Sequence, residues 1–373
     1  MPAITSGLND KKIGVASLTI LFFNLAMAKF MLMVPFFAVK GAGNSAWMIF
    51  LLKGVAALLI FAAAAALYKP YMGLGLGTLS RESLGKFLGG AVNLIIVTVM
   101  TVRGGLLFRI LAEALQTLES DDPTIEYTAL FVLIPVVICA IRGFETNVNA
   151  SILILPFTVI SVVTIFLALI PHYNLSNIMP ILGLGEGKIL KYAFLNIGGA
   201  FEIIYLLILS RSVSDYKTFK RGGLIGIGAV FFVSFLLTLM YCLSVPYPAS
   251  KNFFFPLYQL TRMIKAGSFL QRLEPTVIFI WTAMIICALS TLVIAGGELL
   301  KTTAAEKHSG GFVPLLVMII FFIGALPKSE LSTYDIYNVV LNFSHYFYIV
   351  VIFLIPICAR LRKVERRLSL GTD

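Results

Sequence analysis

The stretch Asn196-Ile197-Gly198-Gly199-Ala200-Phe201-Glu202 interrupts an otherwise apolar run from Ala193 to Ser210. Each glycine in a helix interior costs roughly 1 kcal/mol relative to alanine, and a glycine pair allows the backbone to open. A carboxylate directly after the pair is also expensive inside a membrane helix. We therefore expect the helix to be broken here, with freed N–H and C=O groups directed into the protein rather than at lipid. A close helix–helix contact is the alternative use of paired glycines.

The composition of the whole chain indicates a lipid environment. Of its 373 residues, 59% are hydrophobic and 13% are charged. Soluble domains carry about 25% charged residues, so one soluble globule could not hide this apolar surface. Disordered chains are polar and poor in aromatic residues, whereas this chain is 12% aromatic. Composition therefore excludes a soluble enzyme and predicts an all-α polytopic membrane protein.

Ten apolar runs approach or exceed the roughly 20 helical residues that cross a bilayer. Ten spans divide into two halves of five, and an odd number per half makes the second half enter from the opposite side, as in the inverted repeats of secondary transporters. We therefore predict one transmembrane domain over residues 1–373, with repeats at 10–170 and 190–362. The runs are Ile13–Phe37, Ala46–Leu67, Phe87–Leu115, Tyr127–Ile141, Val148–Ile170, Ala193–Ser210, Leu224–Val245, Pro275–Leu300, Phe312–Leu326 and Tyr337–Arg360.

The net charge of +11 reflects the orientation of the chain in the membrane and does not indicate a nucleic-acid partner. Lys and Arg lie mainly in short loops between the runs, with a roughly twofold excess on the side of both termini, which predicts that both termini are cytoplasmic. The longest loop on the outer side has apolar residues near helical spacing over 254–272. That pattern predicts an amphipathic helix at the outer surface, with an ordinary connector as the alternative.

Ionisable residues inside the apolar runs mark a candidate binding site, because each costs about 2.5–3.5 kcal/mol to insert. Backbone donors at breaks in the first and sixth runs would bind a carboxylate, and Glu202 or a nearby carbonyl would bind an ammonium group. The expected ligand-binding residues are Asn24, Ala28, Lys29, Arg103, Asn196, Gly198, Gly199, Phe201 and Glu202. The alternative is structural: Lys29, Arg103 and Glu202 neutralise one another and hold the bundle in register.

Other polar residues in the runs favour structural roles. Arg109 and Glu113 lie four apart and are expected to pair on one helix face. Lys53 lies about two turns inside the outer end of its run. There, snorkelling of the side chain toward the membrane surface would explain the presence of a charged residue. Ser290 and Thr291 could ligate sodium, although such hydroxyls more often bond back to their own helix. No catalytic or nucleotide-binding motif occurs in the sequence, so we expect no enzyme activity, no cofactor and no metal.

One block of sequence resembles a known family. It runs from Phe254-Phe255-Pro256 to Leu270-Gln271-Arg272-Leu273-Glu274 and is followed by Ile280-Trp281. The start at Asp10-Lys11-Lys12-Ile13, the ten-span layout and a final run with Pro356 and a basic tail are similar as well. The pattern resembles the B subunits of spore germination receptors, within the amino acid–polyamine–organocation superfamily.

The resemblance implies a leucine-transporter-like fold and a sensor that binds a small nutrient, usually an amino acid, to trigger germination. It also implies A-type membrane and C-type lipoprotein partner subunits in the spore inner membrane. It places the site at Asn24–Lys29, Asn196–Glu202 and Arg103. A proton-coupled amino acid transporter and, more weakly, a passive pore are the alternative functions.

Overall fold

The computed structural model describes residues 12–30, 34–116, 125–195, 202–264, 274–327 and 329–364. In these ranges the chain is helical and forms no β-strand, apart from one isolated bridge between Ile13 and Val213. The helices are α1 (Val15–Phe30), α2 (Val34–Ala42), α3 (Ala46–Tyr68), α4 (Gly75–Leu84), α5 (Lys86–Gln116), α6 (Ile125–Arg142), α7 (Phe144–Ala168), α8 (Glu186–Leu195), α9 (Ile203–Ile208), α10 (Tyr216–Ser244), α11 (Pro256–Met263), α12 (Glu274–Ala304), α13 (Val313–Ala325) and α14 (Glu330–Leu361).

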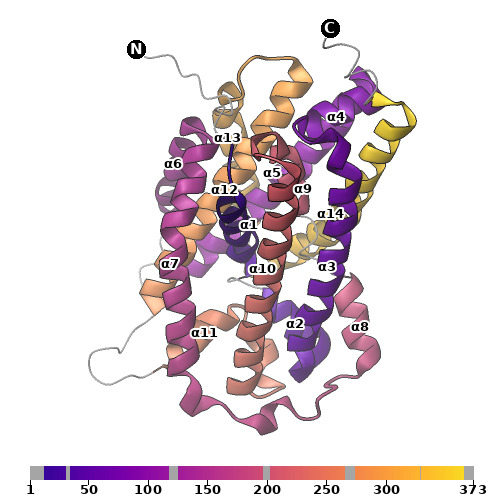
Figure 1. The fold of residues 1–373 in the computed structure, drawn as a ribbon. Coiled ribbons are helices and arrows are strands. Elements are labelled where there is room, and N and C mark those ends of the chain that lie inside the picture. The colour runs from indigo at the N-terminus through magenta and orange to yellow at the C-terminus, as the bar shows by residue number, and fades with distance from the viewer. Residues whose placement is uncertain are drawn as a thin grey trace.

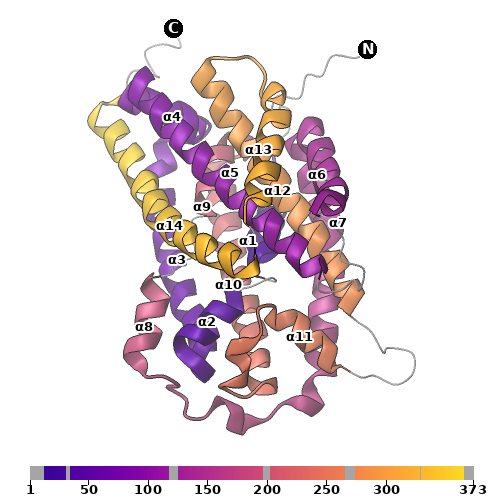
Figure 2. The same cartoon turned by 180° about the vertical axis from the view of Figure 1, so that it is seen from behind.

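The long helices form one elongated bundle (Figure 1). Helix α12 is its central element, since it packs on α1, α5, α6, α7 and α13. The C-terminal end of α14 lies beside α4 at one end of the bundle, and α2, α8 and α11 lie at the other end (Figures 1 and 2). The chain also enters α1 from the end that holds α4, so the described part begins and finishes on one side.

Seven described segments are long and apolar enough to cross a membrane, and three shorter apolar helices cover Val15–Phe30, Ile203–Ser212 and Gly310–Ala325. Each of the ten apolar runs in the sequence overlaps one of these segments. The all-helical, polytopic class is therefore confirmed. Ten crossings and the five-plus-five division stay predictions.

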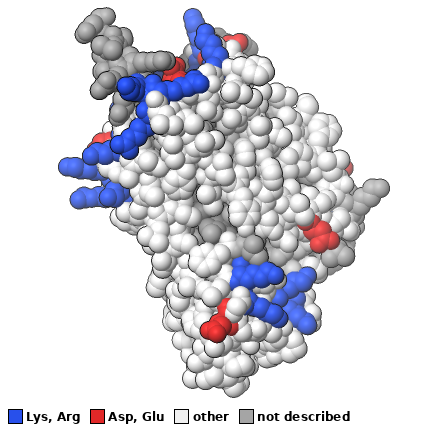
Figure 3. Space-filling view, turned by 90° about the vertical axis from the view of Figure 1, so that its right-hand side faces the viewer, with Lys and Arg blue, Asp and Glu red and all other residues white. Residues whose placement is uncertain are grey.

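The outer surface has the character of a lipid-facing protein. Figure 3 shows a broad belt without charged side chains between a basic cluster at the end near the termini and a smaller mixed cluster toward the other end. Large apolar side chains such as Leu59, Phe131, Phe157 and Phe279 are exposed on the bundle. A soluble monomer rarely exposes an apolar area of this extent, whereas a bilayer accommodates it.

Helix α1 corrects one expectation from the sequence. The residues Asn24–Lys29 lie inside a continuous α-helix that ends at Phe30, and α2 begins at Val34. The polar interruption therefore does not open the backbone at Asn24–Lys29. This segment contains leucine, alanine, methionine and lysine, which are good helix formers, and it has no glycine to release the chain.

Two short helices lie at the ends of the bundle. Helix α4, which lies between the second and third apolar runs of the sequence, packs against α5, α12 and α14. Helix α11 lies within the range expected for the outer amphipathic helix, and residues 265–273 of that range are outside the described part. Leu257 and Leu260 of α11 are buried, so its apolar face packs on the protein.

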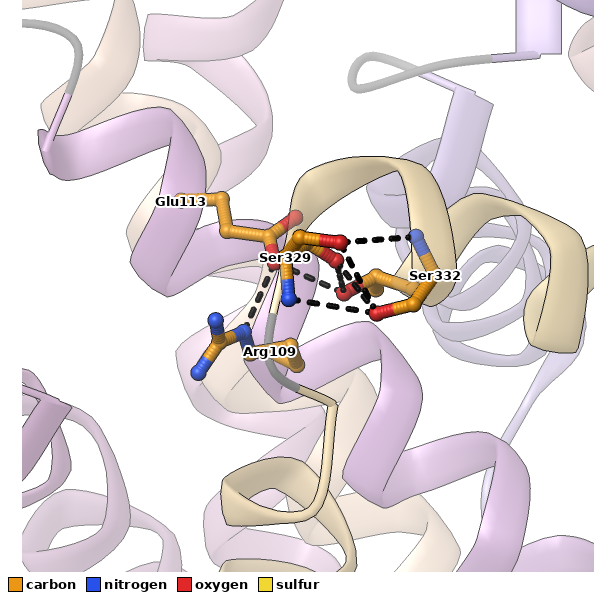
Figure 4. Close-up of polar contacts among 5 residues, drawn as sticks. Arg109, Glu113, Ser329 and Ser332 are labelled. Atoms are coloured by element: carbon orange, nitrogen blue, oxygen red, sulfur yellow. Dashed lines mark hydrogen bonds and ion pairs between the residues drawn. The ribbon is translucent and has the colours of Figure 1, made fainter.

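The expected pair on α5 is present and also anchors the start of α14 (Figure 4). The Nε of Arg109 donates to Oε1 of Glu113 at 2.7 Å. The hydroxyl of Thr333 donates to the same oxygen at 2.7 Å. One turn earlier, Ser329 and Ser332 form a capping box that satisfies free backbone N–H groups of α14. Together, these contacts fix where α14 leaves α5.

Close packing between α3 and α10 depends on glycine, because small residues let membrane helices approach. A Cβ added to Gly223 of α10 would overlap the ring of Phe61 on α3, and that ring is fully buried. Gly228, one and a half turns along the same helix, has open space around it.

We expect Gly223→Ala to lower the free energy of unfolding by about 1–3 kcal/mol, the usual cost of overpacking a core. Gly228→Ala is the matched control and should leave stability unchanged or raise it, because alanine is the better helix former. Thermal unfolding of the purified protein in detergent measures both. Equal midpoints for the two variants would contradict the close contact.

Candidate functional site

The candidate site forms where the C-terminal end of α1 meets the N-terminal end of α9. Lys29 lies in the last turn of α1, and Glu202 is the N-cap residue of α9. The Nζ of Lys29 and Oε1 of Glu202 are 2.5 Å apart. Each charge also suits its own helix end, since the macrodipole favours cations at a C-terminus and anions at an N-terminus.

Arg103 on α5 brings a second cation to the same carboxylate. Its Nη2 lies 3.6 Å from Oε1 of Glu202. The exposed fractions of Lys29, Arg103 and Glu202 are 9%, 8% and 2%, so the cluster is buried inside the bundle. The second oxygen of Glu202, Oε2, accepts no hydrogen bond from any residue that the structure describes. The carboxylate therefore has an acceptor position available to a ligand.

Tyrosine side chains complete the surroundings of Arg103. Tyr205 on α9 and Tyr337 and Tyr348 on α14 lie close enough to interact electrostatically with its guanidinium group. The amino-acid sequence alone did not predict these tyrosines as site residues. Tyr205 follows Glu202 by three residues, which is a helical spacing that could have indicated a shared face. No comparable signal links α14 to the cluster.

A small cavity opens beside the cluster. Lys29, Arg103, Glu202, Tyr205 and Tyr337 line it, together with Gly104 and apolar residues of α12 that include Ala288. The walls thus combine both charge signs with aromatic hydroxyl groups. This chemistry suits a small solute that carries charge.

A second, larger cavity lies on the other side of Lys29. We call it the apolar chamber; its walls come from α1, α2, α3, α8, α10 and α14 and include Phe30, Phe50 and Phe231. Lys53 also lines it and is only 8% exposed. The snorkelling expected for Lys53 is therefore wrong, because its helix turns this side chain into the bundle.

A third and still larger hollow continues toward the end of the bundle that holds α2 and α11. We call it the vestibule. It shares Phe37, Tyr192 and Asn338 with the apolar chamber, and Lys29 is shared between the chamber and the smaller cavity. The three spaces therefore adjoin one another from the surface to the ion cluster.

Two of the remaining predicted site residues, Asn24 and Ala28, lie away from both cavities that Lys29 lines. Asn24 is buried and donates from Nδ2 to the carbonyl of Ser151 on α7 at 2.9 Å, so it ties α1 to α7 and does not line either cavity that Lys29 lines. Ala28 is fully buried and lines neither cavity. Asn24 and Lys29 are five positions apart on a regular helix, which places them on different faces. Asn196, Gly198, Gly199 and Phe201 lie outside the described residues.

The hydroxyl groups considered as sodium ligands bond within their own helix. Ser290 donates to the carbonyl of Ile286 at 2.7 Å, and Thr291 donates to that of Cys287 at 2.9 Å. Thr291 also accepts from Nδ2 of Asn147 at 2.7 Å. In the described part of the chain, no group of three or more His, Cys, Asp or Glu side chains could hold a metal ion.

The fold and this buried site define a multi-pass membrane protein of the permease class. The sequence profile of a family of spore germination proteins matches residues 12–333, and the chain belongs to that family. The family is permease-like and is not an enzyme class.

Two relatives of known sequence are also described as spore germination proteins. The chain is 23% identical over 363 residues to spore germination protein YndE of Bacillus subtilis (strain 168), covering 94% of this chain and 97% of that protein. It is 20% identical over 194 residues to spore germination protein XB of Bacillus anthracis, covering 52% and 54%.

Solved structures with a similar fold include a manganese transporter of Eremococcus coleocola. Its E129A mutant superposes with a TM-score of 0.58 at 14% identity, covering 91% of this chain and 76% of that chain. The same transporter in complex with an aromatic bis-isothiourea compound gives a TM-score of 0.56 at 14% identity, covering 90% and 75%. At this identity the likeness concerns the fold alone.

We expect the members of the ion cluster to contribute unequally to the stability of the protein. Among the described residues Glu202 is the one carboxylate paired with both Lys29 and Arg103. Glu202→Gln leaves two buried cations unbalanced and should lower the free energy of unfolding by about 3–5 kcal/mol. Lys29→Met should cost less, because Arg103 still balances the carboxylate.

Thermal unfolding in detergent measures the two single variants and their double mutant. The double mutant should be more stable than Glu202→Gln alone, since it removes one of the two unbalanced cations. A Glu202→Gln midpoint at or above that of Lys29→Met would show that the carboxylate does not hold the cluster together.

Proposed function

We propose that this chain is the B-type subunit of a nutrient germinant receptor. It binds a small nutrient, an amino acid, at the ion cluster and thereby triggers spore germination. The observation that carries the proposal is the Lys29–Glu202 pair, which joins two helix ends and faces a cavity. Membership of the spore germination family supports the role.

The binding site in this proposal comprises the predicted residues on both sides of the helix junction. Arg103, Lys29 and the backbone around Asn196–Phe201 contact the nutrient, and the available oxygen of Glu202 accepts from its ammonium group. Asn24 and Ala28 act through the position of α1. A ligand can shift only states that it contacts differently, so closure of the α1 and α9 ends around the nutrient is the proposed switch.

The proposed setting follows from the same role. The chain crosses the spore inner membrane ten times as two inverted repeats of five, with both termini in the cytoplasm. The basic cluster in Figure 3, at the end near the termini, supports that orientation. An A-type membrane subunit and a C-type lipoprotein complete the receptor.

Amino acid transport, coupled to protons, is the second candidate. The adjoining vestibule, chamber and cavity support it, because a transported solute needs a route to a central site. Uptake of a labelled amino acid into proteoliposomes that contain this chain alone would favour transport. Uptake that is absent without the partner subunits would favour the receptor.

Filling the cavity tests the proposed site without changing its charges. Ala288 lines the cavity, and Ala283 lies on the same helix, α12, at a partly exposed position outside it. Spores carrying Ala288→Leu should lose the germination response to amino acids, whereas spores carrying Ala283→Leu should keep it. Immunoblots of inner-membrane fractions confirm equal protein levels. A full response with Ala288→Leu at normal levels would refute the site.

A further inference from the structure

The apolar chamber holds a buried lysine, Lys53, that has no carboxylate partner among the described residues. Lys53 forms no hydrogen bond or ion pair with any residue that the structure describes. Its Nζ lies 5.7 Å from the centroid of the Phe50 ring, within the range of a cation–π contact. Such a contact offsets only part of the cost of removing an ammonium group from water.

The charge balance around the chamber strengthens this observation. Lys29, Lys53 and Arg103 are three buried basic side chains in this region, and the single described carboxylate among them is Glu202. The other buried acids, Glu113 and Glu298, pair with Arg109 and Lys301 elsewhere. Basic side chains therefore outnumber acidic ones in this described region, and a bound anion would stabilise the charged form of Lys53.

The residues that line the chamber indicate what the uncharged part of a bound solute is like. Apart from the two lysines, Tyr192, Ser234 and Asn338, the lining is apolar and includes Ile49, Val230 and Leu341. An apolar lining with a few polar groups suits a branched aliphatic body. Access is from the vestibule, whose lining carries Lys40 and Lys251 as well as Asp335.

We propose that the apolar chamber binds a small solute with an apolar body and a carboxylate, and that Lys53 holds the carboxylate. The inference goes beyond the proposed function, because the chamber lies on the other side of Lys29 from the cavity at the ion cluster and is a separate binding space. The carboxylate is required, and an α-amino group is not.

Ligand binding to the purified full-length chain in nanodiscs tests the requirement directly. The probes share one apolar body: leucine has both groups, 4-methylpentanoate has only the carboxylate, and 3-methylbutylamine has only the amine. Glycine has both groups without the body. Leucine and 4-methylpentanoate should raise the unfolding midpoint, and the other two should not. Equal binding of 3-methylbutylamine and 4-methylpentanoate would overturn the proposal, as would no binding of any probe.

Substitution of Lys53 provides the second test. Lys53→Met should weaken binding of 4-methylpentanoate by about tenfold or more, the loss expected when a charge-assisted hydrogen bond is removed. Lys69→Met is the matched control, because Lys69 lies exposed at the other end of the same segment. Lys53→Met should also raise the midpoint of the ligand-free protein, whereas a structural role for Lys53 would lower it. Unchanged 4-methylpentanoate affinity in Lys53→Met contradicts the proposal; if that variant does not fold, the probe series decides alone.

The two proposals fail in different ways. If 4-methylpentanoate binds and depends on Lys53, but deletion of this chain leaves nutrient germination intact, the germination role is wrong and the chamber stands. If Ala288→Leu abolishes germination while 3-methylbutylamine binds as well as 4-methylpentanoate, the germination role stands and the carboxylate requirement is wrong.

Discussion

The buried ion pair between Lys29 and Glu202 is the contact on which the centre of the molecule depends. Neither charge is stable inside a membrane protein unless the other is near. The pair therefore requires α1 to end and α9 to begin at the same place. Two helix ends that meet inside a bundle leave backbone groups without partners in their own helices, and only a protein interior can hold such groups within a membrane.

The second constraint is that one carboxylate serves more than one cation. Arg103 reaches Glu202 from α5, so three separate helices converge on a single side chain. Lys53 adds a further basic side chain on the far side of Lys29. Because Lys29 borders both the apolar chamber and the smaller cavity, a change in what either space holds alters the electrostatic balance of the other. The ion cluster and the chamber thus act as one electrostatic unit.

The sequence predicted those parts of the protein that depend on local pattern. Each apolar run overlaps a described helical segment, because a backbone surrounded by lipid must satisfy its own hydrogen bonds. The Arg109–Glu113 pair followed from a spacing of four within one helix. Features that depend on how a helix is rotated against its neighbours were missed. Lys53 faces the chamber rather than the surface, and Asn24 faces α7 rather than the site, since apolar residues surround both and periodicity gives no direction.

The position of the cluster bears on how binding could be converted into a change of shape. A solute bound to a rigid wall shifts no equilibrium, because it contacts both states equally. A solute at the junction of α1 and α9 contacts two chain segments that are held together by charge, and it competes for the same carboxylate and cations. Its binding therefore changes the free energy of holding those segments in place. Sensing and transport both need this coupling, and they differ in whether the rearranged bundle opens a route to the other side or only alters the surface presented to partner subunits.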